Sequence, residues 1–451
     1  MKQRLYVVMA IVMVLAVGLS SALIGGCAAP PAEAPEAAPP TVPGAPPGVF
    51  VDPETGWWPG RVGPLPVDAP EYGVGFLADC SGPIGFWNAP RLMGADACYA
   101  WLCSNEYGIA GRRPILDWYD HKSNATEATA GYNKLRQKYP WNHYCGTGEW
   151  QMLKPRVDPD QFMAMGCTTA SNTVYPVGYL FGITIYYPDQ YCTFLKWLNG
   201  KWDYAGEGRN PRVAYLTYGS GYGRDFINDQ TAALAKELKV DVVDDIPLPF
   251  AVADPDSIVA ALVKCKADYA YGQGLYASLP PVIKTSYAKG YDIKFCVNTF
   301  GIDEAIITLT GPEAAEGRIL GINNLVLPTE SSEGMDLLKE YWDKHFVKPA
   351  DRCCPYIQAW AEGFAAKECI ETTLQRVGSW DKITSREIRL TLETWNDKNI
   401  RGMVTFNYSP TTRGVGKARV VEVRNGKWTP TVDWFDVPIS APPEWRQPIV
   451  D

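Results

Sequence analysis

The sequence predicts an α/β protein with two doubly wound, parallel-sheet lobes. Two observations support this fold class. Strand-like and helix-like segments alternate over more than 200 residues, which is the pattern of parallel sheets covered by helices. In addition, residues 212–248 form a clear strand, turn, helix and strand unit, so a second α/β stretch begins well inside the chain. We therefore expect two similar domains around a cleft.

The first stretch contains segments whose residue pattern indicates their type. Strands are expected at 72–78 and 113–120, and helices at 89–108, 124–139 and 189–200. "WNHYCGTG" indicates a strand that runs into a loop, and "QFMAMGCTTA" a helix end or a short strand.

The second stretch continues the alternation. Strands are expected at 212–218, 240–248, 267–274 and 291–299, and helices at 223–238, 254–266 and 280–290. Asp254 or Asp256 stands near the start of the helix at 254–266. Residues 333–375 are mostly helical in pattern, and the end from residue 402 is β-rich.

The N-terminus has the layout of a secretory signal, with Lys2 and Arg4, an apolar core over 5–18 and then small residues. Residues 5–26 are also long enough for an uncleaved transmembrane anchor. "LIGGC" (23–27) resembles the bacterial lipobox instead, which implies a signal peptide over 1–26 and acylation of Cys27. More than one acyl chain holds a protein stably on a bilayer.

The segment after Cys27 is a tether by composition. Residues 28–48 contain eight prolines and seven alanines, which cannot form a core and favour extended polyproline II. Loss of Lys2 and Arg4 with the signal changes the formal charge from −8 to −10. An acidic chain does not suit nucleic acid, which needs clustered basic residues.

Twelve cysteines are many for an exported chain. Acylation of Cys27 leaves eleven, an odd number, so at least one is a free thiol or forms an intermolecular bond. Export makes disulfides plausible. No CxxC motif or His-Cys cluster has zinc spacing, so no metal is expected.

Two glycine-rich turns resemble nucleotide motifs only in part. "GQGLYA" (272–277) has the form GxGxxA, but Pro280 and Pro281 allow a helix to start only beyond it, and Asp292 precedes the next strand. "YGSGYG" (218–223) lacks the lysine of a phosphate loop. We expect no cofactor, and a glycine-lined strand end that faces a cleft.

Several other side chains have both an ordinary and a functional interpretation. Tyr222 follows a strand, at the edge where open α/β sheets bind ligands. Trp87, in an expected loop after the first strand, either packs in the core or encloses an apolar ligand group. Asp303 and Glu304 form a carboxylate pair past a strand end, where Asp also starts helices.

Four segments in order resemble one protein family. They are "VGFLADCSGPIGFW", "GIAGRRPILDWYDHKSNATEA", "RVAYLTYGSGYGRDF" and "ADYAYGQG". Together they are similar to type I periplasmic binding proteins of ABC transporters, in the branch of leucine/isoleucine/valine receptors, over about residues 72–435.

The resemblance implies two α/β lobes, a three-segment hinge, and closure on a small ligand. The N-terminal lobe would comprise 70–185 plus 315–405, and the C-terminal lobe 186–314 plus 406–440. A lipid-anchored linker and turn-rich lead-in would occupy 27–69, and a tail 441–451.

The resemblance also implies a set of ligand contacts. Trp87 matches an aromatic residue that covers the ligand side chain, and Tyr222 a tyrosine of the second lobe. Thr169 and Ser171 match residues that hold a charged head group, and Tyr276 or Leu275 falls near a family tyrosine. Asp303 falls near the acidic residue that pairs with a ligand ammonium, which needs a carboxylate partner once desolvated.

One position departs from the family pattern. The family serine after the third strand, which binds the ligand carboxylate, falls here in "CGTGEWQ". Thr147 could replace that serine, but Glu149 would repel a carboxylate. The ligand class therefore stays open among amino acids, amides, amines and aromatic compounds.

The expected function is capture of a small ligand outside the cytoplasm and its delivery to the membrane permease of an ABC importer, by a lipid-anchored monomer. A receptor of the same fold that signals through a sensor partner is an alternative. An exported enzyme is a third possibility, but the chain shows no Ser-His constellation, metal spacing or dinucleotide loop.

Overall fold

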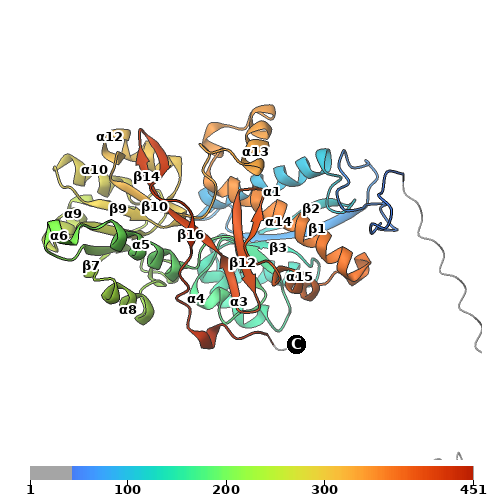
Figure 1. The fold of residues 1–451 in the computed structure, drawn as a ribbon, viewed down its shortest axis with the longest axis horizontal. Coiled ribbons are helices and arrows are strands. Elements are labelled where there is room, and N and C mark those ends of the chain that lie inside the picture. Colours follow the sequence, from blue (N-terminus) through green and yellow to red (C-terminus); the bar gives the residue numbers. More distant parts are fainter. Residues whose placement is uncertain (1–42, 450–451) are drawn as a thin grey trace, which may run out of the picture. The chain divides into compact units, whose positions relative to one another are not determined.

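The computed structural model describes residues 43–449, which fall within one compact unit. Two helix-covered β-sheets form the cores of two lobes, so the predicted α/β fold with parallel sheets is confirmed (Figure 1). The expected signal peptide, Cys27 and most of the tether lie outside the described residues. Within residues 43–449, the helices are too short or too polar to cross a membrane.

The first lobe contains a five-stranded sheet in the order β2-β1-β3-β4-β5. All neighbouring strands in it are parallel, so their carboxyl ends lie along one edge. The strands are β1 (Glu71–Ala78), β2 (Arg113–Asp120), β3 (Asn142–Tyr144), β4 (Ala164–Gly166) and β5 (Leu180–Gly182).

Two distant chain segments supply the helices of the first lobe. In Figure 1, α1 lies beside α14, although about 250 residues separate them. Asn124 caps α2 by accepting hydrogen bonds from two backbone amides, so the helix expected from residue 124 begins at Ala125. The helical elements are α1 (Gly85–Asn105), α2 (Ala125–Leu135), α3 (Thr147–Val157), α4 (Ser171–Val174), α13 (Glu333–Lys344), η2 (Pro349–Asp351), α14 (Cys354–Val377), η3 (Trp380–Lys382) and α15 (Ser385–Leu392).

The second lobe is built on the sheet β15-β14-β10-β9-β8-β6-β7. Strands β6 to β10 are parallel, whereas β14 pairs antiparallel with β10, and β15 and β16 pair antiparallel with β14. The strands are β6 (Arg212–Thr217), β7 (Asp241–Pro247), β8 (Tyr269–Gln273), β9 (Lys294–Val297), β10 (Ile319–Asn323), β14 (Lys417–Arg424), β15 (Lys427–Pro430) and β16 (Phe435–Asp436).

The helix expected at 223–238 is two helices. Ser220 caps the first helix, and Asn228 caps the second through a capping box with Thr231. The extended backbone conformation of Asn228 separates the two helices. The helical elements of this half are α5 (Tyr187–Lys201), α6 (Tyr204–Glu207), α7 (Gly221–Arg224), α8 (Asp229–Glu237), α9 (Pro255–Lys264), α10 (Pro280–Ala288), η1 (Thr299–Gly301), α11 (Glu304–Thr310) and α12 (Pro312–Ala315).

The chain passes between the two main sheets three times: after β5, after β10 and before β14. The expected boundary at residue 315 assigns β10 to the first lobe, but β10 pairs with β9 in the second sheet. The expected boundary at 406 cuts through a third sheet of β11 (Lys398–Ile400), β12 (Val404–Ser409) and β13 (Thr412–Val415). This small sheet contacts the first lobe, where the Tyr408 hydroxyl donates to the carbonyl of Gly182 at 2.9 Å.

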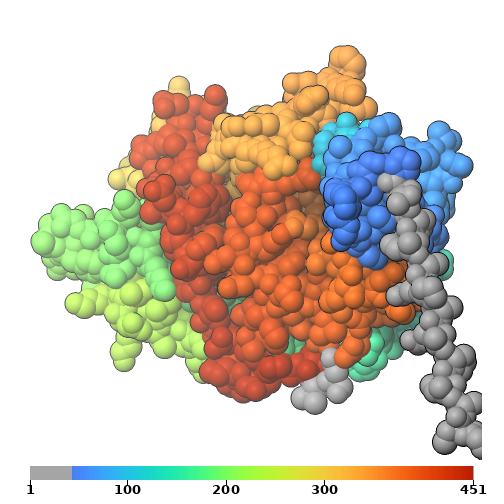
Figure 2. Space-filling model, turned by 45° about the vertical axis from the view of Figure 1, so that its right-hand side comes forward, coloured from blue at the N-terminus to red at the C-terminus, as the bar shows by residue number. Residues whose placement is uncertain are grey.

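Part of the expected linker and lead-in belongs to the folded unit. Trp57 is 1% exposed, and the Trp380 indole donates to Asp52 at 3.1 Å. Figure 2 shows the lead-in, in blue, next to an orange segment that precedes the red C-terminal end of the chain. At the other end, η4 (Pro443–Trp445) of the expected tail accepts a hydrogen bond from the amide of Val177.

Two expected loops are helical. Trp87 lies in the first turn of α1, because that helix begins at Gly85 rather than near residue 89. "CGTGEWQ" leads directly into α3, which begins at Thr147 and holds Glu149 in its first turn. Each helix is the next element after a strand of the first sheet, α1 after β1 and α3 after β3, so their first turns lie at its carboxyl edge.

Candidate ligand-binding site

A cavity of about 300 Å³ lies between the carboxyl ends of the two sheets. Parallel α/β sheets bind ligands at this edge because the turns after adjacent strands converge there. The cavity is lined from the first lobe by Pro83, Ile84, Trp87, Ser123, Cys145, Gly146, Thr147, Gly148, Glu149, Cys167 and Thr168, and from the second-lobe side by Tyr187, Tyr218, Ser220, Gly221, Tyr222, Phe250, Leu275 and Phe300.

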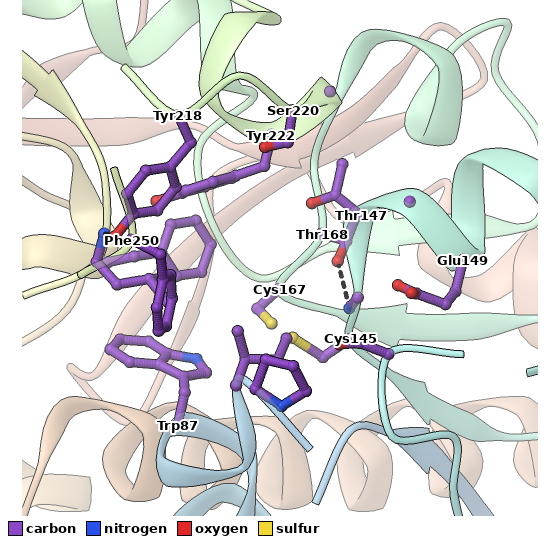
Figure 3. A pocket seen from close by; sticks show the side chains of 18 of the residues that line it. Trp87, Cys145, Thr147, Glu149, Cys167, Thr168, Tyr218, Ser220, Tyr222 and Phe250 are labelled. Atoms are coloured by element: carbon purple, nitrogen blue, oxygen red, sulfur yellow. Dashed lines mark hydrogen bonds between the residues drawn. The ribbon is translucent and has the colours of Figure 1, made fainter. Parts of the chain in front are cut away.

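Aromatic rings form much of the wall (Figure 3). Tyr187, Tyr222 and Phe300 are mutually near-perpendicular, with interplanar angles of 79–85° and ring centroids 5.3–5.9 Å apart, so they form a corner. Trp87 of the first lobe meets this corner, at 5.5 Å from Phe300. Such edge-to-face packing is favourable and gives the cavity rigid apolar sides.

The wall tyrosines direct their hydroxyl groups to protein partners. The Tyr222 hydroxyl accepts from Asn298 Nδ2 at 2.7 Å and donates to the carbonyl of Gly274. The Tyr187 hydroxyl lies 3.2 Å from Thr147 Oγ1. Burial raises the pKa of both phenols well above 10, so both stay neutral. These residues therefore offer mainly ring surface to a ligand.

The start of α3 supplies the polar side of the cavity. Gly146, the residue before the helix, donates its amide to Thr168 Oγ1 at 3.0 Å, drawn as the dashed line in Figure 3. Because Gly146 has no side chain that could cap α3, the first backbone amides of this helix remain available as hydrogen-bond donors. Gly146 has φ +119°, and a Cβ there would lie 2.9 Å from Glu149 Oε2 and from the His121 ring. Only glycine fits this close turn.

Two cysteine side chains form part of the cavity floor. Tyr144 pairs with Gly166 across β3 and β4, so Cys145 and Cys167 are the next opposed positions on these parallel strands. Figure 3 shows their sulfur atoms beside each other. Both are free thiols in the structure, as are the other nine cysteines in the described part of the chain.

The two thiols have opposite pKa shifts. A hydrogen bond from Cys167 lowers the pKa of Cys145 below its ordinary value, and the nearby Arg91 guanidinium acts in the same direction against burial. Burial raises the pKa of Cys167 well above the ordinary thiol value. The two neighbouring thiols of the floor therefore differ in acidity, and Cys145 is the more acidic of the two.

Several contacts join the lobes around the cavity. The amide of Ser171 in the first lobe donates to Asp225 of the second at 2.9 Å. Burial raises the pKa of Asp225 to about 7, although hydrogen bonds from Ser171 oppose the shift. The Phe86 ring of α1 lies 6.3 Å from Phe250. These contacts hold the two lobes together over the cavity.

The structure brings together part of the expected site. Trp87, Thr147 and Tyr222 all line the cavity. The expected contact after strand β8 is either Tyr276 or Leu275. Leu275 lines the cavity, whereas the Tyr276 ring packs against Trp87 and Phe86 and is not part of the lining.

Three other expected residues have structural partners instead of a place in the cavity wall. Thr169 Oγ1 donates to the carbonyl of Ile185 at 2.8 Å inside the first lobe, and its neighbour Thr168 lines the cavity. The Ser171 hydroxyl lies 2.6 Å from the Tyr186 hydroxyl.

Asp303 likewise has structural partners. It caps α11 by accepting from the amide of Ala305 at 2.9 Å, and it also accepts from the amide of Cys354 at 3.2 Å. Burial raises the pKa of Asp303 above its ordinary value. Its carboxylate therefore joins the second lobe to the start of α14.

Sequence reasoning missed several residues of the wall. The sequence pattern does not single out Tyr187 or Phe300, and it presents Cys145 and Cys167 only as members of the cysteine count. The available signal was position: Cys145, Cys167 and Phe300 all come just after a strand of a parallel sheet. Among residues 43–449, no group of three or more His, Cys, Asp or Glu side chains is arranged to hold a metal ion.

Two lobes that share one cavity, lined from both sides, define a ligand-binding protein that encloses its ligand. A family model described as periplasmic binding protein matches residues 71–427. The chain therefore belongs to the periplasmic binding protein family. A comparison with curated proteins found no significant match in sequence.

Solved structures share this fold at low sequence identity. A branched-chain amino acid ABC transporter protein from Thermus thermophilus, with bound valine, is 18% identical with a TM-score of 0.73, covering 82% of this chain and 97% of that one. A fatty acid ABC transporter substrate-binding protein from Thermomonospora curvata is 14% identical with a TM-score of 0.68, covering 86% and 98%. A solute-binding protein from R. palustris, in complex with 4-hydroxybenzoate, is 16% identical with a TM-score of 0.64, covering 82% and 98%.

Proposed function

We propose that the protein is an extracytoplasmic solute-binding lipoprotein that captures a small ligand and delivers it to an ABC importer. The observation that carries this proposal is the cavity of about 300 Å³ between the lobes, lined from both. A ligand held there contacts both lobes, so its binding free energy favours the closed arrangement. The structural relatives named above belong to ABC transporters, which supports the same role.

The proposed location and partners rest on the sequence. Acylation of Cys27 would anchor the protein to the outer face of the cell membrane, and the Ala/Pro-rich segment would let the lobes reach the membrane permease. The protein would act as a monomer, without a cofactor and without chemical turnover. In this proposal, lobe closure is the only event that the ligand has to cause.

The proposed ligand is a small amino-acid-like, amide or aromatic compound. Aromatic walls and a few polar groups suit a compact molecule with an apolar body. Thr147 and the first amides of α3 would bind its polar group, while Trp87 and Tyr222 would enclose the rest. The remaining expected contacts, Thr169, Ser171, Tyr276 and Asp303, would support the wall or the closed state indirectly.

Ligand-dependent thermal stabilisation tests the proposal. Binding only to the folded state raises the melting temperature, and a ligand at 100 times its Kd stabilises the protein by about 2.7 kcal/mol. We expect at least one amino acid, amide, amine or aromatic acid to raise the melting temperature of wild-type protein but not of Tyr222→Ala. Native mass spectrometry of freshly isolated protein should show the bound compound directly.

The control is Tyr291→Ala, which changes an exposed tyrosine away from the cavity and should leave the ligand effect unchanged. Absence of any stabilising compound in a broad panel, together with no co-purifying small molecule, would contradict transport by this cavity. Turnover of a panel compound, abolished by Tyr222→Ala, would contradict the absence of enzymatic activity.

A further inference from the structure

The charge of the cavity is set by one side chain. Glu149 is the only Asp, Glu, Lys or Arg among the lining residues. Within residues 43–449, no hydrogen bond or ion pair engages its carboxylate, whereas the carboxylates of Asp79 and Asp225 both accept hydrogen bonds. For example, Asp79 accepts from Ser123 Oγ at 2.6 Å.

Glu149 is placed to meet a ligand. It lies in the first turn of α3, and Gly146 leaves room for its carboxylate at the turn after β3. In Figure 3, the carboxylate points from α3 toward Thr147 and Cys145, which both line the cavity. A ligand in the cavity therefore faces an unpaired negative charge.

The nearest buried cation is not available to balance a ligand anion. Arg91 lies below the cavity floor, and its guanidinium is paired with Glu362, both side chains being fully buried. A ligand carboxylate would thus place a second negative charge beside Glu149 without a cation in the wall, which is unfavourable in a site shielded from water.

The opposite wall suits a positive charge. Tyr187, Tyr222 and Phe300 form the aromatic corner, and ring faces attract organic cations, more strongly when the cation is desolvated. The Trp87 indole N–H is buried and has no partner in the described residues, so it can donate to an oxygen of the ligand. The cavity thus combines a carboxylate and aromatic faces with the free donor of the Trp87 indole.

We propose that the ligand is a small organic monocation, a protonated or quaternary amine with an apolar body, and that Glu149 is its ion-pair partner. This inference rests on the proposed function and names the ligand class of the same cavity. It assigns to Glu149 of the first lobe the role that the family resemblance gives to Asp303 of the second.

Four compounds with one body and different head groups test the proposal: phenethylamine, phenylalanine, 3-phenylpropionamide and 3-phenylpropionate. Binding to purified full-length protein is measured by calorimetry. We expect phenethylamine to bind most tightly, and Glu149→Gln to weaken it about ten- to hundredfold, as expected for loss of a charged hydrogen bond. The same variant should leave the neutral amide within about twofold and should improve binding of the acid.

Two further variants serve as controls. Glu304→Gln makes the same change in the first turn of α11, outside this cavity, and should leave every affinity unchanged. Asp303→Asn keeps an oxygen that can cap α11 but loses the acceptor for the Cys354 amide, so it should lower stability without a selective effect on the amine. Unchanged melting and circular dichroism of Glu149→Gln would show that the variant is folded.

Several results would overturn the proposal. Tighter binding of the acid or the amino acid than of the amine would show that the amides of α3, not Glu149, select the head group. An unchanged amine affinity in Glu149→Gln would also refute it, as would failure of all four compounds to bind. In that last case, the proposed transport function still stands if a different small molecule co-purifies, and it fails if none does.

Discussion

Replacement of Arg91 by methionine should destabilise the first lobe strongly, because Arg91 belongs to a buried charge network under the cavity. The side chains of Arg91, Glu362 and His143 are all fully buried. Glu362 contacts the Arg91 guanidinium and lies 2.9 Å from His143 Nδ1, while the Tyr99 hydroxyl lies 2.7 Å from His143 Nε2. The network joins α1, α14 and β3, three elements that are distant in the chain.

The expected magnitude follows from the charge that is left behind. Loss of one partner of a buried ion pair costs roughly 3–5 kcal/mol, since the other charge stays buried without compensation. We expect Arg91→Met to lower the free energy of unfolding by about this amount. Replacement of both residues, Arg91→Met with Glu362→Met, removes the orphan charge, so the double variant should be more stable than Arg91→Met alone.

Urea unfolding followed by tryptophan fluorescence measures these differences. The matched control is Arg376→Met, which breaks an ion pair with Glu387 on the surface and should cost about 1 kcal/mol or less. If Arg91→Met cost no more than Arg376→Met, the argument from burial would be wrong. A double variant as unstable as the sum of both single variants would show that packing, rather than the orphan charge, dominates.

Three further predictions concern ionisable groups. Cys145 is the only cysteine of residues 43–449 with a lowered pKa, owing first to the hydrogen bond from Cys167. Iodoacetamide should therefore modify Cys145 before the other thiols, and bound ligand should slow this reaction. Equal labelling of all thiols would contradict this prediction. Burial raises the pKa of Asp225 to about 7 in the closed state, so calorimetry should show affinity that weakens as pH rises from 5 to 8 in wild type but not in Asp225→Asn. Burial also raises the pKa of Asp189 from 3.8 to about 7, so the folded protein keeps a proton that the unfolded chain has released. Unfolding free energy should therefore fall by at most about 4 kcal/mol between about pH 4 and pH 7, and urea titrations of Asp189→Asn should lack that slope.

Local pattern was enough to predict most strands and helices. Residues 113–120 match β2, and Asp254, one of two candidates, is the cap of α9. The predicted helix boundaries were wrong where single residues, such as a capping Asn or a glycine, mask or interrupt the longer periodic pattern. Asn228 interrupts a continuous helical pattern by its capping box, and "WNHYCGTG" has the pattern of a strand that runs into a loop because its two glycines hide the start of α3.

The ligand site depended on contacts that sequence spacing does not contain. Trp87, Thr147 and Tyr222 lie in the cavity because each follows a strand of a parallel sheet, and strand ends can be recognised locally. Thr169 and Asp303 also follow strands, but their side chains bind backbone groups of the surrounding fold. Which side chain turns into the cavity depends on its own rotamer and partners.

The sequence alone determined the α/β class and the two-lobed plan, because apolar periodicity and turn residues are properties of neighbouring residues. Only the tertiary structure decided that Tyr187 and Phe300, 113 residues apart in the chain, form one aromatic corner, and that Glu149 faces the cavity without a partner among residues 43–449. The physical reason is that a cavity between two lobes is formed by their approach. Its charge and shape therefore depend on long-range packing, which no local pattern records.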